Sequence, residues 1–280
     1  MSLSFRRSLL RLPVIGPTIV CLQRLGIAIK IDVRFMGQVL RWLFTSREKT
    51  NLTYALSKVN VAHLAATVAE VAGITVAQAR EYIDEIEADE ELRNHIREAT
   101  LASERRYSSD IDAKYGRRAG WYAVVRAVKP RVVIETGVDK GLGSCVLAAA
   151  LLRNKEEGND GYLYGTDIDP KAGFLLTGPY AEVGEVLYGD SIESLIALEK
   201  TIDVFVNDSD HSAEYEEREY ETVAERLSDR AVILGDNAHV TDKLFQFAQN
   251  TGRKFLYFGE LPANHWHPGQ GIGFAYRSRE

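Results

Sequence analysis

Cysteine is scarce in this 280-residue chain, and its placement excludes two kinds of stabilised fold. The two cysteines, Cys21 and Cys145, lie in unrelated sequence contexts. Neither belongs to a C-x-x-C pair of the kind that binds zinc, and two distant thiols make no disulfide framework. The default compartment for such a chain is the reducing cytoplasm. Internal repeats and low-complexity segments are lacking as well, so we expect an ordinary globular protein.

Long apolar runs are also missing. The longest uncharged stretch near the N-terminus, Leu12–Gln23, has 12 residues, whereas a membrane-spanning helix needs about 20. No small-residue cleavage site follows it, so we do not expect a signal peptide. The net charge of the whole chain is −6, which argues against a dedicated nucleic-acid-binding protein.

The first 50 residues differ in charge from the rest of the chain. Residues 1–50 hold nine Lys or Arg and two acids, a net charge of +7, so the other 230 residues carry −13. We predict a basic, apolar N-terminal arm. One interpretation is peripheral contact with a membrane surface. The other is a helical arm packed on its own domain or on a partner subunit, in keeping with an expected homo-oligomer.

The next segments predict a helical cap and then an α/β domain. Residues 51–116 have apolar residues at helical spacing, with Gly73 ending one helix and a capping box at Thr75 and Gln78 starting another. From Lys129 onward, short apolar strands alternate with helices, which is typical of a doubly wound parallel sheet. The expected strands are 131–137, 162–168, 185–191, 202–208, 231–237, 254–260 and 271–277.

The last two of these strands are too close in sequence for a helical crossover, so we expect an antiparallel hairpin at the sheet edge. Ligands of such a domain bind beyond the carboxyl ends of the strands.

A glycine-rich turn, ETGVDKGLGS, follows the first strand. Its spacing, Glu135, Gly137, Gly141 and Gly143, is not the G-x-G-x-x-G of dinucleotide sites. An acid two residues before the first glycine suits a ligand with positive charge better than a pyrophosphate. The alternative is a purely structural strand–helix turn. The spacing opposes a nicotinamide-dependent oxidoreductase.

Acids also end the second and third strands. Asp167 lies where a carboxylate can accept both hydroxyls of a ribose, and Asp190 with Ser191 can meet an adenine edge. Together with Glu135, these residues fit an adenosine with a cationic tail.

The motifs VVIETGVDKGLGS, GTDIDP, YGDS, FVNDSDHS and ILGDN resemble those of class I S-adenosylmethionine-dependent methyltransferases, over roughly residues 117–277. The chain is most similar to the metal-dependent O-methyltransferases of the catechol and macrolide-sugar types, with their cephalosporin-hydroxylase-like relatives. The resemblance implies a Rossmann-like seven-stranded sheet with an antiparallel last strand, in a domain at 117–280. A departure is Gly143, where the catechol type has a serine that here comes next. The cofactor-binding residues implied are Glu135, Gly137, Gly141, Gly143, Ser144, Asp167, Asp190, Ser191 and Asp208.

Oxygen-bearing side chains follow the fourth and fifth strands. If these strands are adjacent and parallel, as in the superfamily, their tips lie about 5 Å apart, and Asp208, Asp236 and Asn237 converge. Such hard ligands suit Mg²⁺ or another divalent cation, and the resemblance places the metal there. Asp210 is an alternative to Asp208 as ligand. Solvated acidic turns are the plain alternative.

His211 stands where the related families have a lysine or histidine base. A divalent cation would orient the acceptor hydroxyl and ease its deprotonation, and a histidine can accept the proton near neutral pH. Otherwise His211 simply precedes a capped helix.

The predicted function is methyl transfer from S-adenosylmethionine to a hydroxyl of a small molecule, sugar or glycan. The alternatives are a cephalosporin-hydroxylase-like enzyme of the same fold, a nicotinamide-dependent oxidoreductase or a non-catalytic adenosyl-binding module.

Two further groups allow two interpretations each. The loop residues His265, Trp266 and His267 either line an acceptor pocket or belong to an ordinary loop. The pair Arg117 and Arg118 either borders the cofactor or lies at the exposed start of a helix.

Overall fold

The computed structural model describes residues 12–49, 52–236 and 238–278, which form two compact units. The first unit holds the described residues up to Ser46 together with Asn264–His267. The second holds Arg47–Ala263 and the described residues from Pro268 onward. The boundaries predicted after residues 50 and 116 stay predictions.

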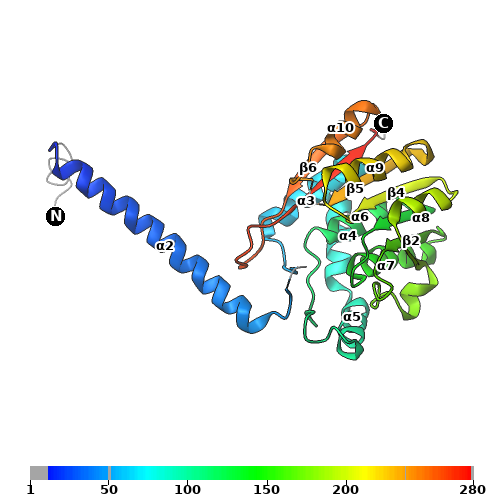
Figure 1. Ribbon diagram of the computed structural model, residues 1–280, viewed down its shortest axis with the longest axis horizontal. Coiled ribbons are helices and arrows are strands. Elements are labelled where there is room, and N and C mark those ends of the chain that lie inside the picture. The colour runs from blue at the N-terminus through cyan, green and yellow to red at the C-terminus, as the bar shows by residue number, and fades with distance from the viewer. Residues whose placement is uncertain (1–11, 50–51, 237, 279–280) are drawn as a thin grey trace. The chain divides into compact units, whose positions relative to one another are not determined.

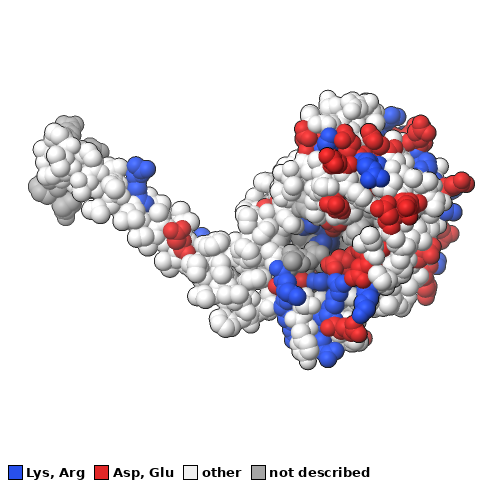
Figure 2. Space-filling model, in the orientation of Figure 1, with Lys and Arg blue, Asp and Glu red and all other residues white. Residues whose placement is uncertain are grey.

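The first unit is built on one long helix, α2 (Ile15–Thr45). With 31 residues it is about 46 Å long at 1.5 Å per residue. Large apolar side chains are exposed along its length, and Figure 2 shows its surface as mostly uncharged. Trp266 packs edge-on against it, with ring centroids 6.5 Å from Phe35 and 5.2 Å from Trp42.

Among the described residues, no single helix combines the length and apolar composition needed to cross a bilayer. The neighbouring helices α3 (Lys58–Ala72) and α4 (Val76–Ala88) meet that requirement only when taken together, and they are bent by 117°.

The second unit contains a seven-stranded sheet in the order β3-β2-β1-β4-β5-β7-β6 (Figure 1). The first five strands pair in parallel, and β7 is antiparallel to both β5 and β6. This confirms the predicted sheet with its antiparallel last strand. The strands are β1 (Val132–Thr136), β2 (Tyr162–Asp167), β3 (Gly184–Tyr188), β4 (Ile202–Asn207), β5 (Leu227–Asp236), β6 (Lys254–Gly259) and β7 (Gly271–Tyr276).

Helices cover both faces of the sheet. The described helical elements besides α2, α3 and α4 are α5 (Glu90–Ala102), α6 (Arg118–Val128), α7 (Leu142–Glu156), η1 (Gly178–Glu182), α8 (Ser191–Ala197), α9 (Ala213–Val223), η2 (Ala224–Arg226) and α10 (Lys243–Asn250). The helices α3 to α7 share one core with alternate strand residues such as Val133 and Val204. The helices α8 to α10 share the other core with their strand neighbours Ile134 and Phe205. Successive strand side chains point to opposite faces, so each continuous apolar strand supplies both cores.

The strand order reverses between β1 and β4, which lie side by side with Thr136 opposite Asn207. Chain crossovers leave in opposite directions from such a pair, so a crevice opens beyond their carboxyl ends. The residues of the candidate site gather there.

Candidate functional site

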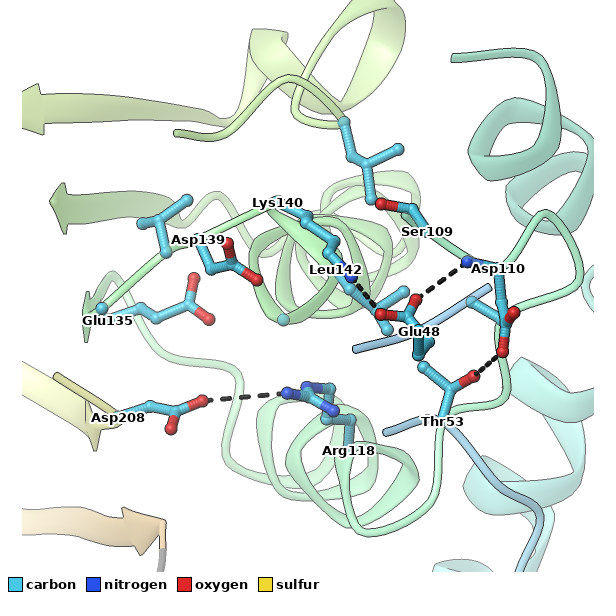
Figure 3. Close-up of a pocket in the computed structure, with 15 residues that line it drawn as sticks. Glu48, Thr53, Ser109, Asp110, Arg118, Glu135, Asp139, Lys140, Leu142 and Asp208 are labelled. Carbon is cyan, nitrogen blue, oxygen red and sulfur yellow. Dashed lines mark hydrogen bonds and ion pairs between the residues drawn. The ribbon is translucent and has the colours of Figure 1, made fainter. Parts of the chain in front are cut away.

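Two pockets lie beyond the carboxyl ends of the parallel strands. The larger has a volume of about 420 Å³. It is lined by Gly137, Asp139, Thr166, Asp167, Ile168, Gly189, Asp190, Ser191, Asp208, Ser209, Asp210 and Tyr215. The smaller, of about 30 Å³, also touches Gly137, Asp139 and Asp208 and reaches Glu135 and Arg118 (Figure 3). The two pockets therefore meet at the glycine turn after β1.

Gly137 is required by the close approach of two strand ends. Its φ is +84°, in the region that favours glycine. A Cβ at this position would lie 1.9 Å from the carbonyl oxygen of Asp208. The turn then enters α7, with Gly141 as N-cap and with Gly143 and Ser144 in the first turn. The glycines thus bring the end of β1 against the end of β4.

Glu135 and Arg118 bring opposite charges to the small pocket. Glu135 is buried and accepts a hydrogen bond from the hydroxyl of Ser144. Burial raises the pKa of Glu135 to about 7, although Ser144 and the guanidinium of Arg118 oppose the rise. Arg118 is also buried, and its Nε has no hydrogen-bond partner among the residues that the structure describes. A ligand with both an ammonium and a carboxylate group fits this pocket.

Asp167 lies at the edge of the large pocket, as predicted from its place at the end of β2. Its two carboxylate oxygens accept hydrogen bonds from the backbone N–H groups of Asp139 and Asp169, each 2.8 Å long. This arrangement fixes the carboxylate where a ribose could reach it.

Asp190 and Ser191 line the same pocket at the start of α8. Asp190 is the N-cap and accepts a hydrogen bond from the backbone N–H of Glu193. The hydroxyl of Tyr215 donates to Asp190 at 3.0 Å and shares a 2.9 Å hydrogen bond with Ser191. Tyr215 is a pocket residue that the sequence analysis missed.

A buried carboxylate, Glu219 on α9, ties the strand ends together. Its carboxylate accepts hydrogen bonds from the side chains of Thr136, Ser191, Asn207 and Ser209. Burial raises the pKa of Glu219, and the surrounding hydroxyls oppose this effect. The sequence analysis missed this residue because EYEEREYE has the composition of a solvent-exposed helix.

Asp208 and Asp236 meet beyond β4 and β5, as the sequence predicted. Burial and the neighbouring charge of Asp236 raise the pKa of Asp208 well above its usual value. The Nε2 atom of His211 lies 3.8 Å from Oδ1 of Asp208. Asp210 is exposed and accepts a hydrogen bond from the backbone N–H of Ser212. Asp208, rather than Asp210, therefore faces the neighbouring strand end.

Asp236 has a partner that the sequence analysis did not assign. The Nε and Nη2 atoms of Arg117 hydrogen-bond to its two oxygens, and Nη1 lies 3.3 Å from Glu260. Burial alone would raise the pKa of Asp236, but the guanidinium of Arg117 holds it below its usual value. Arg117 and Arg118 are both buried, so the expectation of an exposed helix start at these residues is wrong.

These contacts do not fit the predicted divalent cation. Both oxygens of Asp236 are already bound by a guanidinium, and no group of three His, Cys, Asp or Glu in the described part of the chain could hold a metal ion. The third predicted ligand, Asn237, lies outside the described residues.

The small pocket is covered by the chain segment that enters the second unit. Glu48 is buried and pairs with the ammonium group of Lys140 in the glycine turn. It also accepts a hydrogen bond of 2.8 Å from the backbone N–H of Asp110 (Figure 3). The carboxylate of Asp110 accepts a hydrogen bond of 3.2 Å from the hydroxyl of Thr53. The sequence predicted an arm up to residue 50 but no contact with the turn.

The sheet order, the antiparallel β7 and the pockets at the carboxyl ends define the fold of class I methyltransferases. The O-methyltransferase TomG from Streptomyces achromogenes, involved in tomaymycin synthesis and solved with SAM, is similar with a TM-score of 0.51 and 15% identity. The match covers 66% of this chain and 89% of that one. An O-methyltransferase from Bacillus cereus, solved with SAH, gives a TM-score of 0.47 and 15% identity over 71% and 96% of the two chains.

Residues 134–238 match the family model described as a methyltransferase domain. This stretch runs from β1 to just beyond β5. It therefore includes the glycine turn and the strand ends that line the two pockets. No curated protein is similar enough to the chain to be matched. The second unit therefore contains a region, residues 134–238, that is similar to methyltransferase domains.

Proposed function

We propose that this protein transfers a methyl group from S-adenosylmethionine to a hydroxyl group of a small molecule, sugar or glycan. The observation that carries the proposal is the place of Asp208, which lines both pockets and has the imidazole of His211 3.8 Å away. The imidazole therefore lies beside the point where the two pockets meet, and a base at this point can serve a reaction of the cofactor that the pockets would hold.

The residues around the pockets fit the cofactor. In this proposal Glu135 binds the ammonium group and Arg118 the carboxylate of its amino-acid end, since both are buried in the small pocket. Asp167 holds the ribose, and Asp190 with Ser191 meets the adenine in the large pocket. When bound, the cofactor supplies an electrophilic methyl group on its sulfonium.

His211 is proposed as the general base. Its side chain is 40% exposed, so an acceptor can approach it from outside the pockets. The imidazole takes the proton of the hydroxyl at a ring nitrogen, and the carboxylate of Asp208 stabilises the imidazolium that forms. Because the described residues do not fit a divalent cation, no step is assigned to one.

The test is methyl transfer to a panel of hydroxyl-bearing acceptors, followed by release of S-adenosylhomocysteine. We expect His211→Asn to lower turnover by about 10²–10⁴-fold while its affinity for S-adenosylhomocysteine stays unchanged. The control is His63→Asn, at an exposed position on α3. Methylation only at nitrogen or carbon, or full activity of His211→Asn, would contradict the proposal.

We also propose that α2 lies on an anionic lipid surface, which would bring the enzyme to a lipid-linked or glycan acceptor. Its exposed apolar side chains include Leu22, Leu25 and Ile29. The described helix has four basic residues and one acid, so its charge complements anionic headgroups.

Co-sedimentation with vesicles tests this proposal. The full-length protein should sediment with phosphatidylserine-containing vesicles more than with phosphatidylcholine alone, and Leu25→Asp/Ile29→Asp should abolish binding. If the double variant still binds, or if it instead dissociates a dimer seen by light scattering, lipid is not the partner of α2.

A further inference from the structure

We propose that the guanidinium of Arg117 takes the place of the divalent cation in this site, so that the protein positions the carboxylates of Asp208 and Asp236 without a metal ion. The inference rests on the proposed function in one respect, because it assumes that the ends of β4 and β5 take part in methyl transfer. It concerns the residues Arg117, Asp208, Asp236 and Glu260.

The first argument is geometric. Asp236 is 1% exposed, and its two oxygens are bound by two nitrogens of one guanidinium, a bidentate arrangement. An ion bound at Asp236 would have to displace this fork. The displaced Arg117, with a side chain that is 4% exposed, would then remain as a buried cation with only the 3.3 Å contact to Glu260. Removing one partner of a buried pair is strongly unfavourable.

The second argument is that the chain is built to place Arg117 there. The backbone N–H of Arg117 donates to Glu260 Oε1 at 2.7 Å. The preceding Gly116 has φ +53°, and a Cβ there would lie 2.9 Å from the same Oε1 atom. Tyr54 completes the support, because its hydroxyl donates to Glu260 Oε2 at 2.6 Å. Three segments distant in sequence thus hold the guanidinium against Asp236.

The third argument is charge. The two carboxylates at the ends of β4 and β5 face two buried guanidinium groups, because Arg118 Nη2 lies 3.8 Å from Asp208 Oδ2. The positive charge that a divalent cation would bring is therefore already present as side chains.

Direct titration with Mn²⁺, followed by its electron paramagnetic resonance signal and by calorimetry, tests the inference. We expect no saturable binding to the wild-type protein, with or without S-adenosylhomocysteine, and no change in melting temperature with chelator. Arg117→Met should gain a Mn²⁺ site, because Asp208 and Asp236 would be left without that guanidinium, and Arg117→Met/Asp236→Asn should lose it again.

Two outcomes would overturn the inference. One is a stoichiometric Mn²⁺ site in the wild type that Asp236→Asn abolishes but Asp84→Asn, at an exposed pair on α4, does not. The other is a folded Arg117→Met that binds no Mn²⁺. If Arg117→Met does not fold, the wild-type titration decides alone. Failure of S-adenosylhomocysteine to bind in the same samples would count against the proposed function instead, not against this inference.

Discussion

Replacing Glu135 by glutamine is expected to weaken the binding of S-adenosylhomocysteine by about 100-fold, equivalent to about 3 kcal/mol. Glutamine keeps the size of the side chain but removes the charge proposed to pair with the ligand's ammonium group. The partner would then lie in a small buried pocket without its counter-charge. Calorimetry on the wild type and Glu135→Gln measures the loss.

The affinity for S-adenosylhomocysteine should also decrease as the pH falls. Burial raises the pKa of Glu135 to about 7, so the ionised form that pairs with the ammonium group is lost as the pH falls below that value. Affinity for S-adenosylhomocysteine should therefore fall by roughly tenfold for each pH unit below 7. The profile of Glu135→Gln should lack this step.

A matched ligand separates Glu135 from other titrating groups, including Asp208. We expect 5′-methylthioadenosine, which has no amino-acid end, to bind the wild type with an affinity independent of Glu135. If Glu135→Gln weakens both ligands equally, or keeps the pH step, Glu135 does not bind the ammonium group.

The second large effect is expected for Glu219→Ala. This substitution leaves three buried hydrogen-bond donors, on Thr136, Ser191 and Asn207, and one partly buried donor, on Ser209, without their shared acceptor. Breaking such a buried network should lower the free energy of unfolding by about 3–5 kcal/mol. Urea denaturation at pH 7 measures it.

The control is Glu217→Ala on the same helix. Glu217 pairs with Lys243 at 2.9 Å, but its side chain is 46% exposed, so its loss should change the free energy of unfolding by less than about 1 kcal/mol. Similar small losses for both variants would mean that Glu219 does not organise the strand ends.

The strands could be predicted because each one is a short run of apolar residues that is visible in the sequence. All seven expected runs are strands, and their apolar residues fill two cores by simple alternation. The proximity of Asp208 and Asp236 could also be predicted, because β4 and β5 are adjacent and parallel and so end at the same edge of the sheet. These are properties of short segments and of sheet geometry.

The inner face of α9 could be predicted only in part. The sequence pattern predicts Tyr215, Val223 and Leu227 on this face, and Val223 is buried, but Glu219 and Tyr220 are buried as well. A charged side chain is buried here only because its four partners come from other segments. No local pattern reveals such partners, which lie 10 to 83 residues away.

The pairing of Arg117 with Asp236 was missed for the same reason. Arg117 lies 119 residues before Asp236 and 143 before Glu260, and a basic pair before a helix usually lies in solvent. The predicted metal site was therefore chemically reasonable for Asp208 and Asp236 taken alone. The fold brings the guanidinium of Arg117 against Asp236, although the two residues are far apart in the sequence.

The pairing of Glu48 with Lys140 has a consequence for the timing of the catalytic cycle. Glu48 and Lys140 both line the small pocket, so we expect this ion pair to open when the amino-acid end of the cofactor enters or leaves. We therefore expect release of S-adenosylhomocysteine to depend on how often this ion pair opens. We therefore expect the chain segment that holds Glu48 to affect the rate of turnover without changing the affinity of the large pocket for the adenosine group.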